Sequence, residues 1–114
     1  MSHPMNTLWE FTITIASSST PNLIFDGSSG IRAMPPMQLS GLRITNTNQA
    51  GTVYLGTNDS FSGAPGLTTT NFWKQLGPRE ALLNNDVLMG RGQIQHLAII
   101  SDGTSCTVRV EVLQ

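Results

Sequence analysis

The sequence contains few side chains that could carry out covalent chemistry. His3 and His96 are its only histidines, and Cys106 is its only cysteine. His96 and Cys106 lie on either side of the Asp102-Gly103 turn. A hairpin there could pair them, with Cys106 as the nucleophile and His96 as the base of a thiol hydrolase. A thiol and an imidazole in ordinary strand packing explain the pattern better. We therefore predict no catalytic residue and no enzyme activity.

The carboxylates are not grouped as paired-acid catalysis or metal binding would require. The acidic residues are Glu10, Asp26, Asp59, Glu80, Asp86, Asp102 and Glu111. Asp86 follows two asparagines and could contribute to a calcium loop, but the spacing fits a solvated turn better. Asp102 stands beside a glycine, where a carboxylate caps backbone N–H groups. Gly90-Arg91-Gly92 lacks the further glycines and the helix of a phosphate-binding loop. We expect neither a metal nor a cofactor.

Two adjacent aromatic residues, Phe72 and Trp73, are the strongest candidates for a binding surface. Within a strand they would face opposite ways, so that one of them is exposed. Exposure of Trp73 beside Asn71 and Gln75 would favour a carbohydrate-binding module, because a sugar can stack on the indole. Burial of Trp73 at a subunit contact would favour assembly instead. One of the two rings could also close an end of the core.

A second candidate interface is the segment Met34-Pro35-Pro36-Met37. Two methionines beside a stiff diproline form an adaptable apolar surface for another subunit. The same segment could instead cover an open edge of the sheets. We take Met34, Pro35, Pro36, Met37, Phe72 and Trp73 as the candidate interface.

The composition favours a protein that works within an assembly. The chain has 114 residues and a mass of 12.3 kDa, and 39% of its residues are hydrophobic. Only 11% are charged and the net charge is −1, whereas soluble domains carry about 25% charged residues. Without a basic excess we expect no nucleic-acid partner, and without a long apolar run no membrane partner. A weakly charged surface suits a chain covered by neighbours, and the alternative is a small hydroxyl-rich secreted domain.

Period-2 alternation of apolar residues predicts an all-β fold. The expected strands lie near residues 9–15, 22–25, 42–46, 52–56, 72–76, 81–83, 87–89, 93–101 and 106–113. Short strands at this spacing predict a single-domain antiparallel β-sandwich, jelly-roll-like, of about eight strands over residues 8–114, with residues 1–7 as an N-terminal arm. Residues 78–83 could form a turn of helix or a turn into a strand.

Turn chemistry predicts two β-hairpins within this sandwich. Residues 42–46 and 52–56 form the first, and residues 93–101 and 106–113 form the second around Asp102-Gly103. In the last strand Val108, Val110 and Val112 are expected to face inward. Arg109 and Glu111 are expected to face out.

Several segments resemble small bacteriophage virion β-sandwich proteins of the capsid decoration (cement) type. They are Gly41-Leu42-Arg43-Ile44-Thr45-Asn46, Gly51-Thr52-Val53-Tyr54-Leu55-Gly56, the Leu76–Glu80 turn and the residues 97–104 that precede the valine strand. The resemblance covers roughly residues 40 to 113. It departs from the pattern at Pro78-Arg79-Glu80, where those proteins have Pro-Gly-Glu.

The resemblance implies a structural subunit on the capsid surface of a virion. Such a subunit would form a homotrimer and bridge neighbouring major capsid proteins, with the N-terminal arm as a clasp. Tail, baseplate or fibre components are the alternatives within this class. No signal peptide is visible at the N-terminus, so we expect synthesis in the host cytoplasm.

Overall fold

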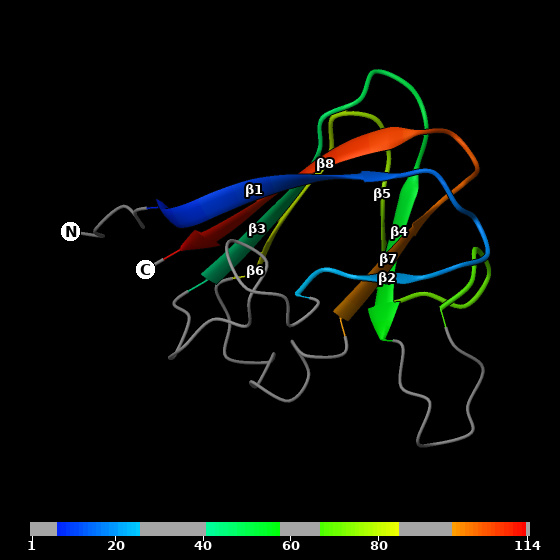
Figure 1. Ribbon diagram of the computed structural model, residues 1–114, viewed down its shortest axis with the longest axis horizontal. Coiled ribbons are helices and arrows are strands. Elements are labelled where there is room, and N and C mark those ends of the chain that lie inside the picture. Colours follow the sequence, from blue (N-terminus) through cyan, green and yellow to red (C-terminus); the bar gives the residue numbers. More distant parts are fainter. Residues whose placement is uncertain (1–6, 26–40, 58–66, 85–96, 114) are drawn as a thin grey trace.

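The computed structural model describes residues 7–25, 41–57, 67–84 and 97–113, and these residues form an all-β fold (Figure 1). The strands are β1 (Thr7–Ile15), β2 (Asn22–Leu23), β3 (Gly41–Asn46), β4 (Val53–Thr57), β5 (Lys74–Leu76), β6 (Ala81–Asn84), β7 (Leu97–Ser101) and β8 (Cys106–Leu113). They make two four-stranded antiparallel sheets, sheet A in the order β1-β8-β3-β6 and sheet B in the order β2-β7-β4-β5. The predicted β-sandwich is confirmed.

The strand pairs are nested, as in one long hairpin that has been rolled up. β1 pairs with β8, β2 with β7, β3 with β6 and β4 with β5, always antiparallel. Pairing of β3 with β8 and of β4 with β7 then completes the two sheets. This order is that of a jelly roll, which confirms the predicted jelly-roll-like architecture. β1 begins at Thr7, one residue before the predicted start of the domain.

Both predicted hairpins are wrong. β3 lies in sheet A and β4 in sheet B, and β7 and β8 are likewise in different sheets. The turns at residues 47–52 and 102–105 therefore carry the chain from one sheet to the other. Local turn chemistry is similar in a hairpin and in such a crossover, so the sequence pattern alone does not separate them.

Asp102 shows what the second of these turns does instead of closing a hairpin. Its N–H donates to Thr52 O at 2.9 Å, and its carboxylate accepts from Thr52 N at 3.1 Å. The carboxylate also accepts from Thr104 N at 2.9 Å, which confirms the predicted backbone cap. This bond from Thr104 is the main cause of the lowered pKa of Asp102. The carboxylate therefore ties the β7–β8 crossover to the β3–β4 crossover.

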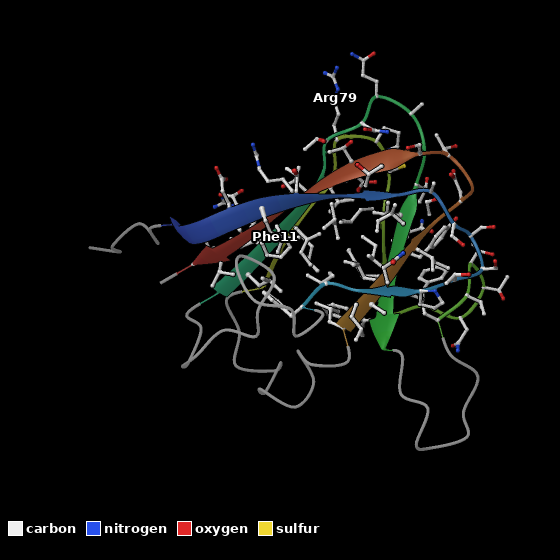
Figure 2. All side chains as sticks on the ribbon, viewed as in Figure 1. Phe11 and Arg79 are labelled. Atoms are coloured by element: carbon white, nitrogen blue, oxygen red, sulfur yellow. The ribbon has the colours of Figure 1, made fainter. Side chains whose placement is uncertain are left out.

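The main core lies between the two sheets and follows the alternation of the strands. Phe11 of β1, which is labelled in Figure 2, packs edge-to-face on Phe25, with ring centroids 5.8 Å apart. The buried residues of this core are Phe11, Ile13, Ile15, Ile24, Phe25, Leu42, Ile44, Val53, Leu55, Leu76, Leu97, Ile99, Cys106, Val108, Val110 and Val112. The inward direction of the three valines is confirmed.

Glu111 faces out of the sandwich as predicted, but its side chain is buried. It lies on the outer face of sheet A, between the inward Val110 and Val112, but it is only 6% exposed. Arg43 Nη1 lies 3.3 Å from Glu111 Oε2, and Arg109 Nε lies 3.4 Å from Glu111 Oε1. One guanidinium group thus contacts each carboxylate oxygen, Arg43 from the neighbouring strand and Arg109 from the same strand, which explains how the carboxylate can be buried on an outer face.

Residues 77–80 form a turn into strand β6, and no helix forms there. Glu80 N donates to Gly77 O at 3.1 Å, and Arg79 has a φ of 62°. A proline followed by a residue with positive φ is typical of a type II turn, which favours glycine at that second position. Figure 2 shows Arg79 at the tip of this turn, with its side chain pointing away from the sheets.

We expect Arg79→Gly to raise the free energy of unfolding by about 0.5–1 kcal/mol, because glycine adopts the left-handed conformation without the Cβ strain. Arg79→Ala keeps the strain and is the matched control, for which we expect little change. Urea unfolding measures both. Equal stability of the two variants would contradict this explanation of the turn.

Candidate functional site

The aromatic patch, as it is called here, consists of the contacting rings of Tyr54 and Phe72 at the edge of sheet B together with Trp73, the next residue in the chain. Phe72 is 37% exposed and Trp73 is 52% exposed. Tyr54 is half-buried, and its ring centroid lies 4.9 Å from that of Phe72, with the planes tilted by 53°. Such a tilted pair is a favourable arrangement of two aromatic rings. The patch thus combines a fixed ring pair with a largely exposed indole.

Strands β4 and β5 position the patch. Val53 and Leu55 are completely buried, so the intervening Tyr54 lies on the outer face of sheet B. Tyr54 is in register with Gln75 of β5, and Gln75 is exposed. An amide side chain therefore lies across from the tyrosine ring on the same face of the sheet.

The segment before β5 is held by a compact turn. Thr68 N donates to Asn71 O at 3.0 Å, and Asn71 N donates to the Thr68 hydroxyl at 2.9 Å. Thr70 N also donates to that hydroxyl, at 3.3 Å. On one side of the turn Leu67 is buried, and on the other Trp73 N donates to Leu55 O at 2.7 Å. The backbone that carries both exposed rings is thus fixed at its two ends.

The structure corrects the predicted placement of Phe72 and Trp73. They do not alternate within a strand, because β5 begins only at Lys74. Both rings are consequently exposed, where the prediction exposed one of them, and neither belongs to the main core. Trp73 is exposed and so are Asn71 and Gln75, two residues before and after it. An exposed indole flanked by two exposed amide residues is the arrangement that would favour sugar binding.

A second apolar cluster supports the patch from the outer face of sheet B. Leu67, Ala98 and Ile100 are buried there, with Leu23 and Tyr54 packed against them. Leu67 lies so close to the sheet that a Cβ on Gly56 would come within 2.9 Å of Leu67 Cδ1. β7 is therefore buried on both faces. The unbroken apolar run at residues 97–100 was the available sign of this second cluster.

Cys106 lies in the main core and is completely buried. Burial raises the pKa of its thiol, and the charge of Asp102 adds to this effect. A buried thiol with a raised pKa is a poor nucleophile, which weighs against the Cys–His hydrolase. His96, the other member of that pair, lies outside the described residues.

Among the residues with described positions, no three His, Cys, Asp or Glu side chains come together as a metal site. The described ranges also contain no helix long and apolar enough to cross a membrane.

The other candidate interface, Met34-Pro35-Pro36-Met37, lies outside the described residues, as do residues 1–6 of the predicted arm. Of the six candidate interface residues the structure thus places two, Phe72 and Trp73, and it brings Phe72 into contact with Tyr54. Comparison with models of protein families, with curated proteins and with solved structures gave no match.

Proposed function

We propose that the protein is a structural subunit of a bacteriophage virion, specifically a decoration protein of the capsid surface. It binds as a homotrimer and bridges neighbouring major capsid proteins. The resemblance of residues 40 to 113 to such proteins supports this role. The jelly-roll fold is also found in viral capsid domains, although many unrelated functions share it.

The observation that carries the proposal is the small number of charged residues on the described surface and the contacts that they make. The described ranges contain eight charged residues, and five of them bind other groups of the chain. These five are Arg43, Glu80, Asp102, Arg109 and Glu111. Six of the eight are exposed and their charges balance, since Lys74, Arg79 and Arg109 are positive and Glu10, Glu80 and Asp102 are negative. The described surface is therefore largely neutral.

A neutral surface suits a subunit that covers a shell. Removing ions from water is costly, and a surface with few of them avoids most of this desolvation penalty on contact. Each contact can then be weak, because many symmetric copies add their contributions over the particle. The same surface gives little charge repulsion to keep separate copies apart in solution.

The experiment that tests this proposal is purification of intact particles from cells that produce the protein. We expect the protein in the particles at a fixed copy number per major capsid subunit, and a trimer by light scattering of the free protein. Met34→Asp with Met37→Asp is expected to reduce the copy number while the circular dichroism spectrum stays unchanged.

A monomer that is absent from particles would overturn the proposal. A few copies per particle, retained in isolated tails, would place the protein in the tail, baseplate or fibre instead.

A further inference from the structure

Trp73 is held in an exposed position by the backbone around it. Its N–H donates to Leu55 O at 2.7 Å, and the turn at residues 68–71 fixes the preceding segment. The indole nevertheless remains 52% exposed, although burial of so large a ring would stabilise the fold. A rigid backbone that presents an aromatic ring to solvent lowers the entropic cost of binding a ligand there.

The polar residues that flank Trp73 in the chain, apart from Lys74, carry neutral groups. Asn71 and Gln75 carry amides, and Thr68 and Thr70 carry hydroxyls, all on exposed residues. Lys74 is the charged residue within the described stretch 67–76. Amides and hydroxyls both donate and accept hydrogen bonds, so they match a ligand that is itself rich in hydroxyl groups.

We propose that Trp73, with Asn71 and Gln75 on either side, is a binding site for neutral saccharides in the pyranose form. The C–H groups on one face of a pyranose ring carry partial positive charge and pack on the negative face of the indole. The sugar hydroxyls bond to the neighbouring amides. This site is independent of the proposed attachment to a virion.

A saccharide fits the aromatic patch better than the other ligands that stack on aromatic rings. Nucleic acid needs basic groups along its backbone, and the chain has six Lys and Arg against seven Asp and Glu. A stable protein partner covers about 20–30 residues on each side, whereas the patch consists of three aromatic residues beside a polar turn. An exposed site of this size binds one sugar ring with an expected Kd of about 1 mM or weaker.

The test is an NMR titration of the intact ¹⁵N-labelled protein with four separate probes: methyl α-mannoside, methyl β-glucoside, methyl β-galactoside and N-acetylglucosamine. The protein has two tryptophans, so the indole N–H signal of Trp9 serves as an internal reference for that of Trp73. We expect a saturable shift of the Trp73 signal with at least one probe. The Trp9 signal should not follow it.

Variants separate stacking from general surface effects. We expect Trp73→Ala to weaken the affinity for the sugar at least tenfold, measured through the shift of the Gln75 backbone N–H signal. We expect Trp73→Phe to retain part of the affinity. Leu83→Ala is the matched control, because Leu83 is a large apolar residue that is 48% exposed on sheet A. Unchanged signals elsewhere in the spectrum show that each variant is folded.

The absence of a saturable shift with all four probes would overturn the saccharide site, as would unchanged affinity of Trp73→Ala. Particle purification with Trp73→Ala keeps the two proposals apart. Loss of the variant from particles without any sugar binding would make the patch a shell contact, so that the virion role stands and the saccharide site fails. If the protein binds a sugar but is absent from particles, the saccharide site stands and the virion role fails.

Discussion

Gly51→Ala is expected to lower the free energy of unfolding by about 3 kcal/mol, and the loss has two separable causes. Gly51 has a φ of 93°, a conformation that costs about 1 kcal/mol for a residue with a Cβ. A Cβ there would also lie 2.7 Å from Cys106 Sγ and 2.9 Å from Thr104 Cβ. Cys106 cannot move aside easily, because it is completely buried in the core, whereas Thr104 is exposed.

Gly103→Ala is the matched control for this prediction. Gly103 has a φ of 105°, but a Cβ there would meet no atom within 4 Å. We expect this variant to lose about 1 kcal/mol, from backbone strain alone. Urea unfolding of both proteins measures the difference. A Gly51→Ala protein as stable as the Gly103→Ala protein would show that the two crossovers do not pack against each other as the structure has them.

The close approach of Gly51 to Cys106 predicts that substitutions at the two positions have non-additive effects on stability. Cys106→Ala removes the sulfur that the new Cβ would meet first. In a double-mutant cycle we therefore expect Gly51→Ala to cost less in the Cys106→Ala background, by 0.5 kcal/mol or more, the size typical of residues in contact (roughly 0.5–3 kcal/mol). Strict additivity of the two losses would contradict a direct contact.

The strands were predictable because a strand buried on one face has an apolar residue at every second position. β8 spans Cys106–Leu113, the same residues that the valine alternation predicted, and β1 differs from its prediction only by starting at Thr7. The choice of partner strands was not predictable in this way. It depends on contacts between loops far apart in sequence, such as the two hydrogen bonds between Asp102 and Thr52. The alternation of apolar residues carries no information about such contacts.

The candidate site was predictable in its residues but not in its geometry. The pair Phe72-Trp73 predicted an exposed ring, although it was expected inside a strand with one ring exposed, and the structure exposes both residues before β5. Tyr54 was missed, because its part in the patch comes from its register with Gln75 and from its contact with Phe72. Both are properties of the β4–β5 pairing, which joins residues about twenty positions apart in the chain.

Asn46 is a second side chain, in addition to Asp102, that connects the crossovers. It is completely buried, and its Nδ2 lies within hydrogen-bond distance of Gly51 O, Leu76 O and Gly77 O at 3.1, 3.3 and 3.2 Å. Its Oδ1 accepts from Asn48 N at 3.2 Å. The amide thus joins the β3–β4 crossover to the turn between β5 and β6.

Asn48 connects the β3–β4 crossover to the β7–β8 crossover in the same way. It is the matched control for a substitution of Asn46. Its Oδ1 accepts from Thr107 N at 3.0 Å, and its Nδ2 donates to Ser105 O. It is only half-buried, so water can replace part of what a substitution removes.

Asn46→Asp keeps the size of the side chain but replaces its donor group with an acceptor facing three carbonyl oxygens. We expect a loss of about 3 kcal/mol at neutral pH, from unsatisfied buried carbonyls and a desolvated charge, and about 1 kcal/mol for Asn48→Asp. For a chain of this size the first loss lowers Tm by roughly 10 °C or more. Calorimetry of the two variants beside the parent protein provides the comparison.

The pH dependence identifies the cause of the Asn46→Asp loss. Burial among carbonyl oxygens raises the pKa of the introduced carboxyl above its unfolded value of about 3.9. Below that unfolded value the group is protonated in both states, so the charge contributes nothing to the difference from the parent protein. The difference must then grow as the pH rises from the unfolded pKa to the raised folded pKa. A difference that is constant across this range would mean that the carbonyl oxygens do not face the side chain at position 46.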